Sequence, residues 1–185
     1  MRCWILFTLS AGLLVGTAAL GQAAPDDGQL MQACFGEKNT PDQLLQGCSA
    51  IIAAKRAPSN AIASAYYNIG NYYRDNQKDY NRAIGYYNLA IDVNPGHGGA
   101  WFNRSIMYHY NKDTAKAIAG YTQAIKLSPL NASIYYNRGV AYKETKDYGR
   151  AIADFDQALQ LDPANQRFVD IRASVIKLIG QQRPD

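Results

Sequence analysis

Histidine and cysteine are scarce in this chain of 185 residues, which contains two histidines and three cysteines. Neither His97 nor His109 lies near a serine or cysteine in a pattern typical of a catalytic nucleophile. No Cys-x-x-Cys spacing offers the ligands of a metal site. The glycines around His97 lack the Lys-Ser or Lys-Thr pair that completes a phosphate-binding loop. The sequence therefore predicts a protein that is not an enzyme and uses no cofactor or metal.

The excess of positive over negative charge is also small. The chain has 19 lysines and arginines against 15 aspartates and glutamates, which gives a net charge of +4 and a pI of about 8.9. These charges are spread along the sequence and form no dense basic patch of the kind that a phosphate backbone requires. Nucleic acid is therefore not an expected partner.

What the chain does have is a repeat of 34 residues. Four features recur in register: an aromatic ring, a small residue four positions later, an alanine near the start of a second helix, and a proline after that helix. Small residues allow two helix backbones to approach closely, and the rings fill the space that remains. The recurring residues are Tyr66, Trp101 and Tyr135; Gly70, Ser105 and Gly139; Ala83, Ala117 and Ala151; and Pro95, Pro129 and Pro163.

This pattern resembles the tetratricopeptide-repeat (TPR) family, in which each unit is a pair of antiparallel helices that must stack on a neighbour. The resemblance implies an all-α, right-handed superhelix, or α-solenoid, with units at 63–97, 98–131 and 132–165. The first unit is one residue longer, and we place the extra residue in its turn, 75–79. We expect Asp79, Asp113 and Asp147 to cap the second helices, and the prolines to end those helices.

Other segments flank the three repeats. Within 24–62, the sequence Thr40-Pro41-Asp42-Gln43 begins an apolar helical pattern that we interpret as half a repeat. After the repeats, 166–185 contains a capping helix, in which Phe168, Ile171, Val175 and Leu178 have helical spacing.

The N-terminal residues 1–23 show the pattern of a secretory signal peptide, with Arg2, an apolar run, and small residues before Pro25. The alternative is an uncleaved anchor, because the run approaches the length that spans a membrane. We expect cleavage, a location in the bacterial periplasm, and no integral span in the mature chain. Small exported bacterial TPR proteins resemble this layout.

In an exported protein, Cys34 and Cys48 favour a disulfide over a metal site, since no nearby histidine supplies further ligands. Such a bond would hold the segment after Cys34 against the helix that begins near Pro41.

The resemblance also implies where a ligand binds. In TPR proteins the second, fifth, sixth, ninth, twelfth and thirteenth positions of each unit line the concave wall. Here the sixth positions are a column of amides, Asn68, Asn103 and Asn137, similar to the asparagine ladder with which O-GlcNAc transferase holds peptide backbone. The fifth positions are rings, Tyr67, Phe102 and Tyr136. The alternatives are that the asparagines cap backbone groups or face water, and that the rings pack between repeats.

Chaperone-binding TPR domains hold a C-terminal carboxylate with a clamp of cations, and the match to that clamp is partial. Asn71 and Asn103 fit two of its positions, but Tyr67, Ser133 and Asn137 occupy places that need a cation. We therefore expect an adaptor or scaffold that binds an extended peptide of a protein partner. The alternative is a structural subunit or homo-oligomer that uses its ends or convex face.

Overall fold

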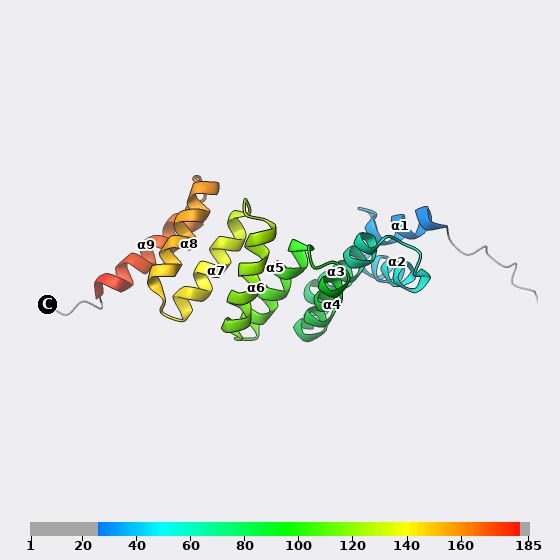
Figure 1. Cartoon of the computed structure of the whole chain (residues 1–185), viewed down its shortest axis with the longest axis horizontal. Helices are drawn as coiled ribbons and strands as arrows, with labels where there is room; N and C mark the ends of the chain where they lie inside the picture. The colour runs from blue at the N-terminus through cyan, green and yellow to red at the C-terminus, as the bar shows by residue number, and fades with distance from the viewer. Residues whose placement is uncertain (1–25, 182–185) are drawn as a thin grey trace, which may run out of the picture.

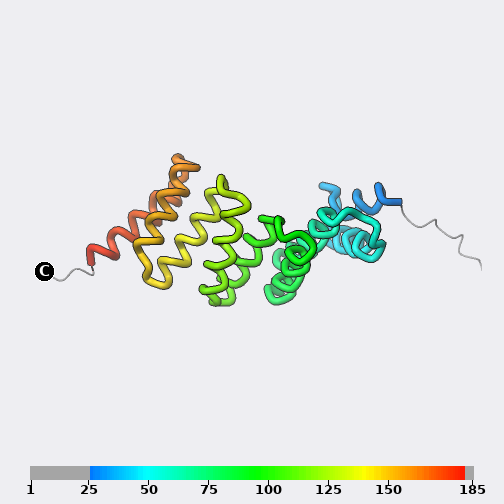
Figure 2. The backbone as a smooth tube through the Cα atoms, viewed as in Figure 1, coloured from blue at the N-terminus to red at the C-terminus, as the bar shows by residue number. Residues whose placement is uncertain are grey.

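The structure is a computed structural model that describes residues 26–181, and this part of the chain is helical and contains no strand (Figure 1). Consecutive helices pack against each other in an elongated stack, with α1 at one end and α9 at the other (Figures 1 and 2). The predicted all-α solenoid is therefore confirmed. The helices are α1 (Asp27–Phe35), α2 (Pro41–Ala54), α3 (Ser59–Asp75), α4 (Tyr80–Val93), α5 (Gly98–Tyr110), α6 (Thr114–Leu127), α7 (Ala132–Glu144), α8 (Tyr148–Leu161) and α9 (Gln166–Gln181).

Close approach of two helices within a repeat depends on the small residue of the first helix. A Cβ added at Gly139 in α7 would lie 2.7 Å from Cε1 of Phe155 in α8, so only glycine fits there. The second repeat solves the same problem differently. Ser105 replaces the glycine in α5, and the opposing residue in α6 is Gly120, where a Cβ would lie 2.1 Å from the Ser105 hydroxyl oxygen. In the second repeat the glycine that permits close contact thus lies on the second helix and not on the first.

The caps and turns of the repeats agree with the sequence. Asp79, Asp113 and Asp147 accept hydrogen bonds from backbone N–H groups three residues later, as predicted. The N–H of Asp113 donates to the carbonyl of Tyr108, five residues earlier, whereas the N–H of Asp79 reaches Tyr73, six residues earlier. The extra residue of the first unit therefore lies in this turn. The second helices end at Val93, Leu127 and Leu161, directly before the residue that precedes each proline.

The N-terminal segment differs from half a repeat because it forms a complete helix pair. The capping of α2 by Thr40 and Gln43 is as predicted, but α1 was not predicted. Its sequence signal is a capping box, in which Asp26 and Gln29 satisfy each other's backbone N–H groups. Gly47 permits close contact of the two helices, since a Cβ there would lie 2.3 Å from the Ala33 carbonyl carbon.

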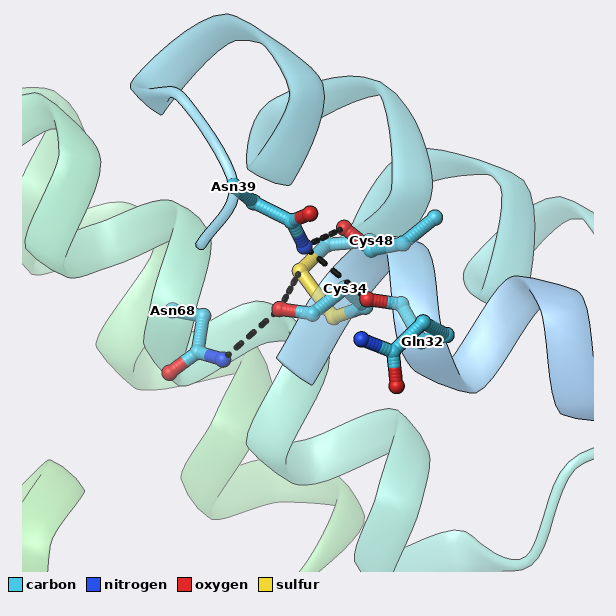
Figure 3. The surroundings of a disulfide bond; sticks show 6 residues. Gln32, Cys34, Asn39, Cys48 and Asn68 are labelled. Carbon is cyan, nitrogen blue, oxygen red and sulfur yellow. Dashed lines mark hydrogen bonds between the residues drawn. A yellow bond between two sulfur atoms is a disulfide. The ribbon is translucent and has the colours of Figure 1, made fainter. Parts of the chain in front are cut away.

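The sulfur atoms of Cys34 in α1 and Cys48 in α2 lie 2.07 Å apart, at bonding distance, and both residues are fully buried (Figure 3). Beside them, the side-chain amide of Asn39 donates to the carbonyl oxygens of Gln32 and Ala33, at 2.9 and 2.7 Å. This amide satisfies the last carbonyls of α1. Contacts within the N-terminal segment thus hold α1 against α2.

The C-terminal helix α9 covers the last repeat, as predicted. Phe168 and Val175 are buried against α7 and α8. Leu178, which the sequence placed on the same apolar face, is instead 37% exposed, and Val169 and Ile176 are exposed as well. The predicted signal peptide and the final residues of the tail lie outside the described residues. Between residues 26 and 181, no helix is long and apolar enough to span a bilayer.

Candidate functional site

The seven residues that the sequence assigns to a ligand fall into three groups in the structure. Asn68 and Asn71 line a pocket of about 210 Å³ between α2 and α3. Tyr136 and Asn137 line a larger pocket of about 590 Å³ between α5 and α7, which we call the α5–α7 pocket. The remaining three line neither pocket: they are Tyr67, Phe102 and Asn103.

Asn103 belongs to a hydrogen-bond network inside the stack. Its side-chain nitrogen donates to the Tyr67 hydroxyl at 3.0 Å and to the Asn71 side-chain oxygen at 2.9 Å. The same Asn71 oxygen accepts the hydroxyl of Tyr87 at 2.8 Å. A primary amide has two N–H donors, so both donors of Asn103 are used. This residue is 6% exposed and joins α3 to α5.

The next repeat lacks the partners for an equivalent network. One repeat later, Phe102 stands in place of Tyr67 and Ile106 in place of Asn71, and neither side chain accepts a hydrogen bond. Asn137, the counterpart of Asn103, instead donates to the backbone carbonyl of Ser133 at 2.7 Å and stays half-buried. The asparagine column is therefore internally bonded at α5 but open at α7.

Tyr121 in α6 also lacks the hydrogen-bond partner that its counterpart in the first repeat has. It is the counterpart of Tyr87 and is fully buried, yet its hydroxyl has no hydrogen-bond partner in the described part of the chain. Burial raises the pKa of both phenols well above the ordinary value of 10, so both remain protonated donors at neutral pH. Ile106 packs against the cluster that contains Tyr121. The polar network of the first interface is thus replaced by apolar packing at the second.

The α5–α7 pocket has an apolar floor with a polar rim. Ile106, Val140 and Tyr136 supply the apolar surface, and the Tyr136 ring stacks on Phe168 of α9 with centroids 5.1 Å apart. The rim combines charged and polar groups from the end of α5, the turn after it, the start of α6, α7 and the start of α9. The complete lining is Ile106, His109, Tyr110, Lys112, Thr114, Tyr136, Asn137, Val140, Glu144 and Arg167.

Charges at the rim are unequally paired. Nε2 of His109 lies 2.7 Å from a carboxylate oxygen of Glu144, which links α5 to α7. Arg167 lies over the Tyr136 ring, with its guanidinium carbon 4.6 Å from the centroid. Within residues 26–181, neither Arg167 nor Lys112 forms an ion pair. The lining of the pocket therefore holds two cations, Lys112 and Arg167, against one carboxylate, Glu144.

The arginines that follow the asparagines are structural. Arg138 forms a two-pronged ion pair with Asp154, at 2.8 and 2.7 Å. Arg104 differs, because it donates to the Asn88 side-chain oxygen and lies over the ring of Trp101, 4.4 Å from its centroid. Trp101 faces α6 and does not line the α5–α7 pocket.

Several pocket residues were not singled out from the sequence, although a signal for them exists. Every α5 and α7 residue that lines the pocket occupies one of the six concave positions that the family resemblance implies. In the second and third units only the fifth and sixth positions were chosen, which missed the ninth positions, Ile106 and Val140, and the thirteenth positions, Tyr110 and Glu144. Arg167 was missed because α9 was read as a cap, yet it holds the second position of a fourth unit. In the described part of the chain, no three His, Cys, Asp or Glu residues gather as metal ligands would.

Solved structures resemble this stack over much of its length. The TPR domain of OM64 from Arabidopsis is 26% identical, with a TM-score of 0.62, and the match covers 65% of this chain and 98% of that domain. The first TPR domain of Spaghetti (RPAP3), solved with an HSP90 peptide, is 24% identical with a TM-score of 0.62, over 64% and 93% of the two chains. A MamA RS-1 double mutant is 20% identical with a TM-score of 0.64, over 73% of each chain.

Family models match the repeats directly. Models described as tetratricopeptide repeat match residues 63–97 and 132–165, and one described as TPR repeat matches 107–146. No curated protein sequence matches the chain. The repeat spacing, the stacked helix pairs and these three matches agree, and the chain belongs to the tetratricopeptide-repeat family.

Proposed function

We propose that this protein is a non-catalytic interaction module that binds an extended peptide segment of a partner protein along α3, α5 and α7. It would act as an adaptor or scaffold in the cell envelope. The observation that carries the proposal is the α5–α7 pocket, because it combines an apolar floor with an amide that is not consumed by internal bonds. An amide can pair with both the N–H and the C=O of an extended chain.

Asn137 is suited to this role. Its bond to Ser133 uses one of its two N–H groups, which leaves the second N–H and the side-chain oxygen for a ligand. The Spaghetti domain, which has the same fold, was solved with a bound peptide. Peptide binding on the first helices of this stack is therefore a use that the scaffold supports, although fold alone does not select the partner.

The envelope location rests on the N-terminal sequence and on the cysteine pair. Residues 1–23 have the composition of a secretory signal, and the sulfur atoms of Cys34 and Cys48 are placed for a disulfide. Disulfides persist in oxidising compartments such as the periplasm. We infer that the mature chain is exported and carries this bond.

Affinity capture from an envelope extract tests the proposal. The mature protein serves as bait beside two variants, Asn137→Ala in the pocket and Asn60→Ala as a matched control on an exposed part of α3 that lines none of the pockets described above. We expect Asn137→Ala to lose partners that Asn60→Ala retains, while both keep their helical circular dichroism. Equal capture by all three proteins would reject the pocket as the binding site.

The second candidate is a structural subunit that self-associates through the end of the stack. The observation in its favour is a pair of exposed apolar side chains on one face of α9, Val169 and Ile176, which lie seven residues apart and are 41 and 45% exposed. Light scattering over a range of concentrations distinguishes the two candidates. A monomer with an accessible pocket favours peptide binding, whereas a dimer that Ile176→Glu dissociates favours self-association.

A further inference from the structure

We propose that the α5–α7 pocket is a specificity subsite that accepts one large apolar side chain of an extended peptide, with an acidic residue next to it in the peptide sequence. This inference rests on the proposed peptide-binding function and names the chemistry of the segment that is bound.

The subsite exists because one interface of the stack lacks the internal network of the other. Between α3 and α5, Tyr67, Asn71 and Asn103 bond to one another and fill the space between the helices with satisfied polar groups. Between α5 and α7, Phe102 stands in place of Tyr67 and Ile106 in place of Asn71. Asn137, the counterpart of Asn103, therefore has neither partner. The network is absent at the second interface, and that interface is where the larger pocket lies.

An apolar side chain fits the floor of this pocket. Ile106 and Val140 come from adjacent first helices, and the Tyr136 ring forms a further wall fixed by its stacking on Phe168. Ile106 and Val140 have no polar side-chain atom, and the Tyr136 hydroxyl is not one of the buried polar groups that lack a partner in the described chain. Because Tyr136 is only 9% exposed and is held between Phe155 and Phe168, its ring is already in place before a peptide binds. A preformed apolar site reduces the ordering cost of binding.

The charges of the rim select the neighbouring residue. Lys112 and Arg167 line the pocket and are exposed, and no carboxylate of the described chain pairs with either. Glu144 is the one carboxylate in the lining, and its contact with His109 is an ion pair only when the histidine is protonated, so the two cations leave the rim with an excess of positive charge. The cationic rim therefore attracts an aspartate or glutamate beside the apolar anchor and repels a lysine or arginine.

An array of synthetic nonapeptides with capped ends tests this chemistry. The central residue is phenylalanine, leucine, serine or alanine, and its neighbours are aspartate, asparagine or lysine, in a background of glycine and serine. We expect peptides with an apolar centre and acidic neighbours to bind at least about tenfold more tightly than those with alanine at the centre. Lysine neighbours should abolish this binding. Preference for serine or alanine at the centre, or for lysine neighbours, would overturn the inference.

Two matched lysines test the rim. Lys112 and Lys146 occupy the same position of successive turns, both with positive φ (60° and 61°), but only Lys112 lines the pocket. Lys112→Gln should weaken binding of the acidic array peptides about two- to fivefold, as expected for an exposed ion pair, and the loss should vanish in high salt. Lys146→Gln should bind like the parent. Equal effects of the two substitutions, or no effect of Lys112→Gln, would contradict the role of the rim.

Restoring the network tests the subsite itself. The double variant Phe102→Tyr with Ile106→Asn supplies the acceptors that Asn137 and Tyr121 lack, and it should lower affinity for the best array peptide at least about tenfold. If the double variant folds poorly, Arg167→Gln provides an exposed second test of the same peptide, with an expected effect like that of Lys112→Gln. Unchanged binding in both would overturn the inference.

These outcomes separate the inference from the function on which it rests. If array peptides bind but respond to Asn68→Ala and not to changes at the α5–α7 pocket, the protein binds peptides elsewhere and only the inference fails. If no array peptide binds and the envelope capture yields no partner, peptide binding as a whole is rejected.

Discussion

The side-chain nitrogen of Asn103 donates to the side-chain oxygen of Asn71 across 2.9 Å, and this bond joins the first helices of two successive repeats. Asn71 and Asn103 are also two of the residues that the sequence assigns to a ligand. Their amides are bonded to each other and to Tyr67 and Tyr87, so a peptide at this place would have to displace internal hydrogen bonds. At the interface between α5 and α7, Asn137 has no such bonds to other side chains.

Asn103→Ala should reduce the stability of the fold while leaving peptide affinity nearly unchanged. The substitution removes two buried hydrogen bonds and leaves the Asn71 oxygen with the Tyr87 hydroxyl alone. We expect a loss of about 1–3 kcal/mol in the free energy of unfolding. Urea denaturation of parent and variant measures this change, with Asn60→Ala as the control. A variant of parental stability would show that the network contributes nothing measurable.

Asp154→Ala should be more damaging. Asp154 has a side chain that is 7% exposed, and it holds the guanidinium of Arg138, which also donates to the Thr122 hydroxyl. Its removal leaves a half-buried cation without its counter-charge, a change that costs about 3 kcal/mol or more. Thermal unfolding should show the loss, and the double variant Arg138→Met with Asp154→Leu should recover part of it. A double variant that is no more stable than Asp154→Ala alone would contradict this explanation.

Stability should fall as the pH decreases below about 6.5, in part because of His97. Desolvation by burial lowers the pKa of this histidine below its ordinary value of 6.5. The unfolded chain therefore binds the proton more readily than the folded chain, and protonation favours unfolding. In the folded state the neutral ring caps α5, because Nδ1 accepts the backbone N–H of Ala100 at 3.1 Å.

His97→Asn retains a capping acceptor and lacks the titrating ring. Its melting temperature should change less between pH 7.5 and pH 5.5 than that of the parent. The carboxylates with lowered pKa values, Asp75, Asp113 and Asp147, act near and below their ordinary 3.8 and so outside this range. Equal pH dependence in parent and variant would assign the effect to another group.

The cysteine pair predicts a stability that depends on oxidation. A bond between Cys34 and Cys48 would close a short loop and contribute about 3 kcal/mol in the loop-entropy model. We expect Cys34→Ser to unfold at lower urea, and a reductant to lower the stability of the parent but not of the variant. Thiol titration of the denatured mature protein checks the premise. Two reactive thiols in the purified exported protein would refute the bond.

The repeats were predictable from sequence because their signals are local and redundant. The small residues, the caps such as Asp113 and the prolines each mark the same boundaries, so no single position had to decide. Helix α1 was missed because it lacks the ring that marks the first helices, since Gln32 stands 34 residues before Tyr66, and the remaining sequence signal was the capping box of Asp26 and Gln29. The insertion in the first turn was located correctly because Gly70 lies 35 residues before Ser105, whereas Ala83 lies 34 residues before Ala117. The extra residue must therefore lie between Gly70 and Ala83.

The candidate site was harder to predict, because it depends on what lies opposite each residue. Asn103 and Asn137 are equivalent in sequence, yet only Asn103 meets a tyrosine hydroxyl and an amide across the interface. The distinction follows from Phe102 and Ile106, one repeat after Tyr67 and Asn71. It becomes visible only when repeats are compared in pairs, since each interface takes its side chains from two units.

The exchange of glycine between Ser105 and Gly120 has a consequence for how such a chain can change over time. In the first and third repeats, Tyr86 and Asp154 occupy the position of Gly120. A side chain at this position would collide with the hydroxyl of Ser105. A recombination that transplanted α5 without α6 would thus bring together two incompatible surfaces. The packing of the middle unit is therefore preserved when α5 and α6 are exchanged together.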